Sequence, residues 1–283
     1  MQIKRFICIV LFSFYSQWVL ASLPIQYWQT SSGARVYFVE NHDLPMLDIN
    51  VEFAAGSAMD TACKSGCANL VQHLLSLGAG GLSEDQIATA LADVGAQLKN
   101  NFDRDRAGLA LRTLSSERER KQALDVFARI IQSPEFPQEI LLREKARIIS
   151  SIKESSTKPD YIGERELMKM LYSNHPYGFN EQGEIDTLNN LQREDLLAFY
   201  RSFYVAGNAV IAIIGDVTQL EAAAIAEQLT DSLPSSGQKT EVPAVSIPVA
   251  GIKRIPHPAT QSHIQLAYPG LLRSDPDYFP LLV

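Results

Sequence analysis

The sequence predicts an α+β fold in which an antiparallel-rich sheet packs against helices. Two observations support this fold class. Apolar and polar residues alternate at 34–40 and 47–54, with turn residues at 41–45 between them, which predicts an antiparallel hairpin. Further along, apolar residues recur three and four positions apart in several segments between residues 66 and 233, which is typical of amphipathic helices.

The remaining elements follow in order along the chain. Ser83 and Gln86 form a capping box ahead of an apolar stripe that ends at Gly95. The segment 209–215 is apolar throughout, which predicts a strand buried on both faces. Other strands are predicted at 97–102 and 107–114, and helices at 66–78, 83–95, 116–131, 137–156, 161–172, 193–204 and 218–233.

Composition and charge limit the classes of protein to which this chain can belong. The 283 residues are 46% hydrophobic, carry a net charge of -7 and contain no long basic run, which favours an acidic globular protein over a nucleic-acid binder. Lys4 and Arg5 precede an apolar run at 6–15, and 19–21 offers a small-residue cleavage site. We therefore expect a secretory signal peptide at 1–21, export to the periplasm or medium, and no membrane span after its removal.

The most informative stretch is the predicted helix at 66–78, with Gly78 at the position of a C-terminal cap. In such a helix Asn69, Gln72 and His73 share one face, one turn apart. This is the spacing at which a helix presents two metal ligands at i and i+4 with an acid/base residue between them.

This stretch resembles the zinc helix of the M16 metallopeptidases (pitrilysin, insulinase and mitochondrial processing peptidase), whose pattern is H-x-x-E-H. The resemblance extends over 32–60, 82–111 and 175–217. It implies an M16/LuxS-like metallohydrolase domain, with zinc as the cofactor of active members.

The residues at the family's key positions differ from that pattern. Asn69 replaces the first histidine, and a carboxamide oxygen is a poorer zinc ligand than an imidazole. Gln72 replaces the glutamate and cannot act as a general base. The family's third ligand, a glutamate on a later helix, corresponds to Ser151. Only His73 remains, so we assign no catalytic or metal-binding residue and expect no cofactor.

Three functions remain open. The first is a non-catalytic homologue that cradles peptides and partners an active zinc peptidase of the M16 type. The second is a metallopeptidase whose site uses His73 with Cys67 or Glu154. The third is a stand-alone peptide-binding module. The family's edge strand, which lies along the substrate, corresponds to 99–102. Expected partners are an active M16 subunit or a second copy, and peptides or unfolded protein segments, without nucleic acid.

The domain organisation follows from the same resemblance. We expect an M16-like N-terminal domain at 22–233, a linker without periodicity at 234–248, and the beginning of a second, homologous domain at 249–283, with strands at 262–268. Because about 35 residues cannot bury a core of their own, we interpret the chain as a truncated version of a two-domain protein.

Two cysteines, Cys63 and Cys67, remain after signal removal. In an oxidising compartment they form either a disulfide or two semi-buried thiols, and the spacing does not distinguish these alternatives. Of the other histidines, His175 precedes Pro176 and is expected to shape a loop, whereas His42 shows no partner at metal-ligand spacing.

Overall fold

The computed structural model describes residues 24–236, 241–258 and 260–282, so the expected signal peptide at 1–21 lies outside the described residues. The sheet has six strands in the order β1-β2-β8-β3-β7-β6. Only β2 and β8 pair in parallel, and the other neighbours are antiparallel. The predicted antiparallel-rich α+β fold is therefore confirmed. The strands are β1 (Gln26–Gln29), β2 (Arg35–Glu40), β3 (Met46–Phe53), β6 (Gln97–Phe102), β7 (Ala107–Leu114) and β8 (Val210–Gly215).

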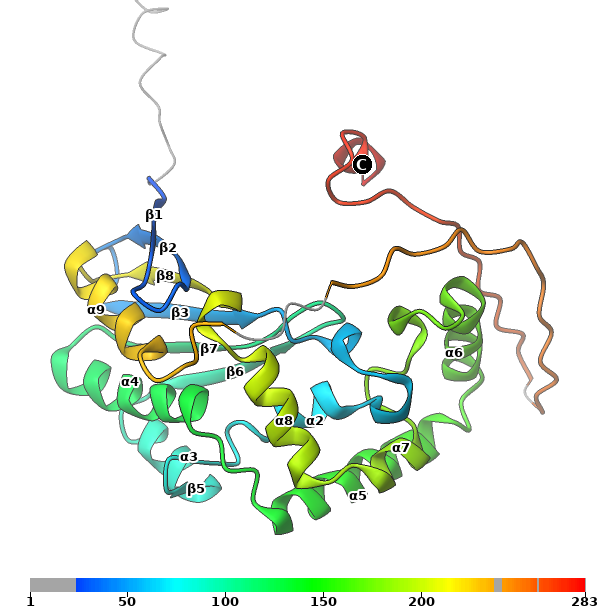
Figure 1. The fold of residues 1–283 in the computed structure, drawn as a ribbon, viewed down its shortest axis with the longest axis horizontal. Coiled ribbons are helices and arrows are strands. Elements are labelled where there is room, and N and C mark those ends of the chain that lie inside the picture. The colour runs from blue at the N-terminus through cyan, green and yellow to red at the C-terminus, as the bar shows by residue number, and fades with distance from the viewer. Residues whose placement is uncertain (1–23, 237–240, 259, 283) are drawn as a thin grey trace, which may run out of the picture.

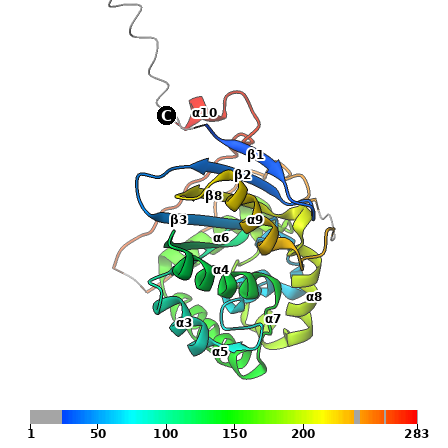
Figure 2. The ribbon, with the colours of Figure 1, turned by 90° about the vertical axis from the view of Figure 1, so that its left-hand side faces the viewer.

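Helices cover one face of this sheet, and Figures 1 and 2 show them beneath the strands. The helices between residues 67 and 230 are α2 (Cys67–Leu74), α3 (Glu84–Ala92), α4 (Glu117–Gln132), α5 (Gln138–Ser155), α6 (Pro159–Tyr172), α7 (Ile185–Asn190), α8 (Arg193–Phe203) and α9 (Gln219–Thr230). Of these, α6 lies beyond the end of the strands and does not cover the sheet (Figure 1). The capping box of Ser83 and Gln86 is present at α3, and Thr218 caps α9 in the same way. No helix among the described residues has the length and apolar character needed to cross a membrane.

The opposite face of the sheet is open. In β8, Ile211 and Ile213 point into the core and are fully buried, whereas Ile214 is 49% exposed. The prediction that 209–215 is buried on both faces is therefore wrong. An apolar run indicates only that its side chains can be buried. Because the described helices lie against only one side of the strands, the side chains on the other side of β8 remain accessible.

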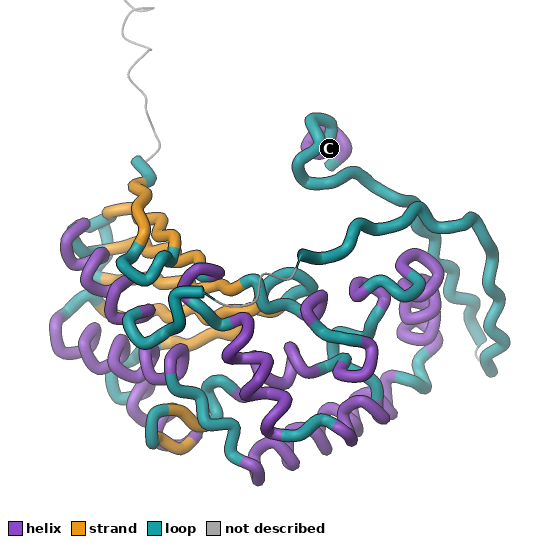
Figure 3. The backbone as a smooth tube through the Cα atoms, in the orientation of Figure 1, coloured by secondary structure: helices purple, strands orange, loops and turns teal. Residues whose placement is uncertain are grey.

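The C-terminal segment runs as an extended chain beside α6, away from the sheet (Figure 3). Residues 262–268, predicted as strands, form none, and Ile264 and Leu266 are 90% and 77% exposed. A strand needs a neighbouring strand to complete its hydrogen bonds, and this segment lies beside a helix instead. Its described contacts include an ion pair between Lys253 and Glu166, and it ends in the short helix α10 (Tyr278–Leu281).

Candidate functional site

Helix α2 begins abruptly, and its first turn is held by a buried carboxylate. The two oxygens of Asp60 accept hydrogen bonds from the backbone N–H groups of Gly66 and Ala68, at 2.8 and 2.9 Å. Gly66 has φ +92°, and a Cβ there would lie 2.8 Å from the backbone at Gln182 and Gly183, so the turn requires glycine. Burial raises the pKa of Asp60 to about 7, although the N–H groups act to lower it.

The helix is shorter than predicted. It ends at Leu74, and Gly78 is not its cap but the first residue of strand β4 (Gly78–Ala79), which pairs with β5 (Leu82–Ser83). Gly78 has φ +150°, and a Cβ would lie 2.8 Å from Pro137. The glycine is therefore needed for a close chain crossing beyond the helix, a role that local sequence does not distinguish from capping.

The structure separates the residues expected to share one face of α2. Gln72 is only 2% exposed and points towards the sheet, whereas the side chain of His73 is 43% exposed and faces α5. Asn69 is half-buried. Consecutive helical residues are rotated by about 100°, so neighbouring positions can face different surroundings even when both lie on one broad side.

Gln72 is held by both ends of its amide group. Its Nε2 donates to the backbone carbonyl of Gly108 in β7 at 2.6 Å, and its Oε1 accepts from the hydroxyl of Tyr204 at 2.9 Å. Tyr204 follows α8 and is fully buried, and its ring packs against Tyr200 and Phe53. Gln72 therefore joins α2 to the sheet and to the end of α8.

His73 contacts a carboxylate that the sequence did not indicate. Its Nε2 lies 2.9 Å from Oε2 of Glu144, a residue of α5 that is 1% exposed. Arg143 and Arg147 also donate to Glu144, at 2.6 and 3.0 Å. Burial raises the pKa of Glu144, but the hydrogen bonds from these three side chains outweigh it and hold the pKa below its ordinary value.

The other candidate ligands are not brought to His73. Cys67 points towards α8, where its Sγ contacts the backbone carbonyl of Asp195, and burial raises the pKa of its thiol. Glu154 pairs with Lys158 at 3.0 Å on exposed surface. Ser151 is exposed, two turns of α5 beyond Glu144. Among the described residues, no three His, Cys, Asp or Glu side chains are grouped as a metal site.

The two cysteines do not form a disulfide. Cys63 is exposed and Cys67 is buried, and both sulfurs are free. Of the two alternatives left open by the sequence, the structure has free thiols, but they are not both semi-buried as expected, since one is exposed and the other is buried. The prediction for His175 is also confirmed, because its Nδ1 accepts from the N–H of Tyr177 at 3.1 Å while its Nε2 donates to the carbonyl of Pro243 at 2.8 Å.

These donors do not fit a catalytic zinc ion. Zinc in such sites takes neutral imidazoles and free carboxylates. Here the Nε2 of His73 is engaged by Glu144, and two guanidinium groups already surround that carboxylate. The amide of Gln72 is turned towards Gly108 and Tyr204. A cation placed between these groups would lie beside positive charge and find few free lone pairs.

Strand β6 lies at one edge of the sheet, as predicted for 99–102. Lys99 and Asn100 are exposed there. Inside the edge, the amide of Asn101 donates to Oδ1 of Asn50 at 2.7 Å, which ties β6 to the open face of β3. Among the described residues β6 has a neighbouring strand on one side only, so its outer backbone edge is suited to pairing with another extended chain.

Sequence reasoning did not identify Glu144, Tyr204 or Asp60. Glu144 and Tyr204 contact α2 from 71 and 132 positions away, and a single sequence carries no signal for such pairs. A role for Asp60 was easier to predict, because an acidic residue shortly before a helix stabilises the N-terminus of that helix. Its distance of six residues from Gly66 is longer than that of an ordinary cap.

Two family models match this chain. The model described as "Insulinase (Peptidase family M16)" matches residues 35–180, and the model described as "Peptidase M16 inactive domain" matches residues 190–283. Together they cover every strand of the six-stranded sheet except β1, the helices around α2 and the extended C-terminal segment.

Known proteins agree with these matches. An uncharacterized zinc protease of Rickettsia felis is 25% identical over 209 residues, which cover 73% of this chain and 50% of the relative. A probable mitochondrial-processing peptidase subunit beta of Arabidopsis thaliana is 24% identical over 256 residues, covering 89% and 48%. The chain thus spans about half the length of these curated relatives.

A solved structure is more similar still. The crystal structure of a peptidase M16 inactive domain from Pseudomonas fluorescens superposes with a TM-score of 0.82 at 34% identity, covering 90% of this chain and 62% of that one. The fold around α2, the family models and these relatives agree, and the chain belongs to peptidase family M16.

Proposed function

We propose that this chain is an exported, non-catalytic M16 homologue that holds extended peptide segments and partners an active zinc-bearing M16 subunit. In this proposal residues 22–233 form the N-terminal domain, 234–248 the linker and 249–283 the beginning of a second domain. Export rests on the signal peptide expected at 1–21.

The observation that carries the proposal is the position of Gln72. It stands where active members have the glutamate that takes a proton from the zinc-bound water. A residue in that role needs a titratable group that faces the substrate. Gln72 has no such group, and its amide is buried against Gly108 and Tyr204. The position has thus exchanged a chemical role for a structural one.

The surroundings of His73 support the same conclusion. Asn69 offers a weak ligand where active members have an imidazole. Glu144 binds His73, Arg143 and Arg147, so the carboxylate nearest to the remaining histidine is neutralised by protein groups. In this arrangement the helix of a zinc peptidase is still present, but within the described part of the chain no free negative charge remains beside His73 to bind zinc.

Peptide holding is supported by strand β6. Its free edge and exposed side chains at Lys99 and Asn100 are suited to strand addition, in which backbone hydrogen bonds supply affinity and need no metal. This mode of binding is independent of catalysis, so it persists in a chain that has lost the zinc ligands.

Metal analysis tests the loss of catalysis. The mature protein purified with zinc present should contain no stoichiometric zinc by elemental analysis and should cleave no peptide beyond the buffer control. Stoichiometric zinc in the wild-type chain that disappears in His73→Ala would contradict the proposal.

Backbone-modified peptides test the proposed holding role. An extended peptide that pairs with β6 uses the N–H groups of every second residue towards the strand. N-methylation of one alternate set should abolish binding measured by fluorescence anisotropy, and methylation of the other set should leave it nearly unchanged. An equal loss of peptide binding for the two N-methylated sets would argue against strand addition.

Co-purification tests the partnership. A tagged mature chain should retain a second M16 protein with an intact H-x-x-E-H helix when isolated from its source. Peptide binding without such a partner would favour the stand-alone binding module, and recovery of a dimer of this chain would favour self-association.

A further inference from the structure

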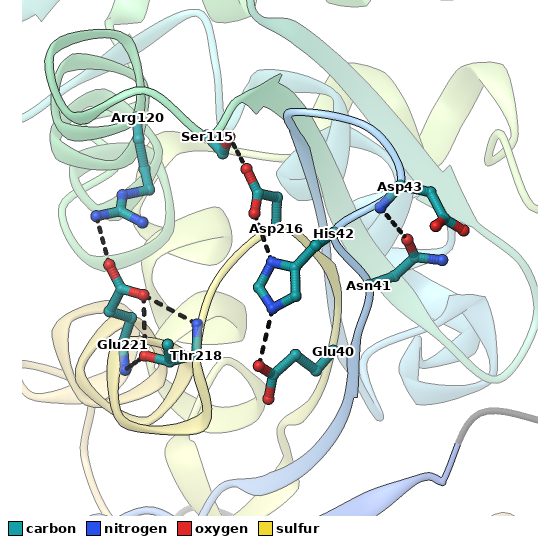
Figure 4. Close-up of polar contacts among 9 residues, drawn as sticks. All are labelled: Glu40, Asn41, His42, Asp43, Ser115, Arg120, Asp216, Thr218 and Glu221. Carbon is teal, nitrogen blue, oxygen red and sulfur yellow. Dashed lines mark hydrogen bonds and ion pairs between the residues drawn. The ribbon is translucent and has the colours of Figure 1, made fainter.

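A polar cluster lies at one end of the sheet, apart from α2 (Figure 4). Its central residue is His42, in the loop between β2 and β3. The imidazole Nδ1 lies 2.6 Å from Oδ1 of Asp216, which follows β8, and Nε2 lies 2.9 Å from Oε1 of Glu40 at the end of β2. One ring therefore contacts two carboxylates from separate segments.

The chemistry of this contact fixes the charge of the ring. An ionised carboxylate only accepts hydrogen bonds, and a neutral imidazole has one N–H donor and one acceptor nitrogen. Both contacts of His42 can be hydrogen bonds only if both nitrogens carry protons. The arrangement shown in Figure 4 is therefore that of an imidazolium ion.

Within the part of the chain that the structure describes, the surrounding elements add no other hydrogen-bond acceptor for the His42 ring. Ser115, between β7 and α4, donates its hydroxyl to the second oxygen of Asp216. Arg120 of α4 pairs with Glu221 of α9 at 2.9 Å, and Glu221 also accepts from Thr218. The carboxylate of Asp43, in the same loop as His42, points away from the imidazole in Figure 4.

The two carboxylates are not equivalent. Asp216 is held on its other oxygen by Ser115, and its own N–H donates to the carbonyl of Met46 at 2.9 Å, so its position is fixed from two further sides. Glu40 has a longer side chain and no second contact of this kind among the described residues. A ring that loses one proton should therefore keep its bond to Asp216 and lose the one to Glu40.

We propose that His42 is a pH-sensitive latch between the β2–β3 loop and the turn after β8. In acid it is an imidazolium ion that bridges Glu40 and Asp216. When it loses a proton, the Nδ1–H tautomer stays on Asp216 and Glu40 is released. The proton passes to solvent, and the cluster becomes more negative by one charge.

The pH range follows from the direction of the shift. The hydrogen bonds to Asp216 and then Glu40 raise the pKa of His42 above its ordinary value of 6.5. A raised histidine pKa stabilises the fold below the unfolded value, and this contribution is lost as the pH rises through the folded value. The latch is therefore still closed at the ordinary value of 6.5, and it opens as the pH rises through the folded pKa, which lies above that value.

Nitrogen-15 chemical shifts of the imidazole test the proposal in the whole chain. Both nitrogens of His42 should be protonated in acid, and above the midpoint Nδ1 should keep its proton. His175 is an internal control of the opposite kind, because its Nδ1 accepts from Tyr177 and its Nε2 should carry the proton. An Nε2–H tautomer of His42 above its midpoint would overturn the proposal.

Two variants separate the carboxylates. Glu40→Gln should lower the midpoint of His42 and preserve the Nδ1–H tautomer, because the new amide can donate to a neutral Nε2. Asp216→Asn should lower the midpoint and shift the proton to Nε2, facing Glu40. A midpoint that is unchanged in Glu40→Gln would overturn the proposal, as would an unchanged tautomer in Asp216→Asn.

Discussion

Gln72→Glu is expected to destabilise the fold by about 2–4 kcal/mol near pH 7, because it buries a charge that faces an acceptor. The glutamine Nε2 that donates to Gly108 becomes an oxygen, which would meet the carbonyl oxygen at 2.6 Å. Only one oxygen of the new carboxylate retains a donor, the hydroxyl of Tyr204. Urea unfolding of the variant and the wild-type chain measures the difference.

The pH dependence of this variant has a defined sign. A buried carboxyl without a cation has a raised pKa in the folded state, so the folded chain binds a proton more tightly than the unfolded chain. The loss of unfolding free energy caused by Gln72→Glu should therefore become smaller as the pH falls from about 7 to about 5. Gln132→Glu is a matched control, since Gln132 donates to the carbonyl of Gln228 at the same 2.6 Å but is only half-buried. Equal losses in both variants would contradict the structural role of Gln72.

This result bears on attempts to restore activity. Reinstating the family's glutamate at position 72 adds a group that the surrounding core no longer accommodates. The substitution is therefore coupled to Tyr204 and Gly108. Under the proposed non-catalytic function, restoring the family's residues alone should not give a peptidase, and the buried neighbours of position 72 would have to change as well.

Asp60→Ala is expected to cost about 2–3 kcal/mol, because it leaves two buried N–H groups at the start of α2 without an acceptor. The groups are those of Gly66 and Ala68. Asp60→Asn should cost less, since the amide oxygen still accepts one of these hydrogen bonds. Chemical unfolding monitored by circular dichroism provides the comparison, and equal stability of the alanine variant and the wild-type chain would contradict this role.

Asp60 also predicts a pH effect. Its folded pKa of about 7 lies above the ordinary value of 3.8, so the folded chain holds this proton more tightly. The wild-type chain should gain stability from this group as the pH falls from about 7 towards about 4, and Asp60→Asn should lack that gain. A stability difference between the two that does not change over this range would show that Asp60 is ionised throughout.

Much of the fold was predictable because it depends on local pattern. The strands at 97–102 and 107–114 have the predicted bounds, since alternating apolar residues and the turn between them are both visible in sequence. The capping box at Ser83 was predictable for the same reason, because every atom of that motif lies within four residues. Local pattern was thus a reliable guide for these elements, whereas it failed at 262–268, where the described residues supply no neighbouring strand.

The candidate site was only partly predictable. The resemblance predicts that Asn69, Gln72 and Ser151 stand at the family's key positions, but the sequence does not show which way each side chain points. The inward direction of Gln72 depends on Tyr204, and the pairing of His73 depends on Glu144, which the packing of α2 against α5 and α8 brings together. The exposure of Ile214 likewise depends on which face the helices cover.

The place of β8 in the sheet has a consequence for folding order. It lies between β2 and β3, so residues 35–40 pair with residues 210–215. Until β8 is made, the strands before it in the sequence can form these pairings only as two pieces, β1 with β2 and β3 with β7 and β6, each with an unpaired edge. Such long-range pairing is slow, and open strand edges are prone to aggregation. Strand β8, the last of these six strands in the sequence, joins the two pieces. Full burial of Val36 in β2 and Ile49 in β3 therefore requires β8 to be in place.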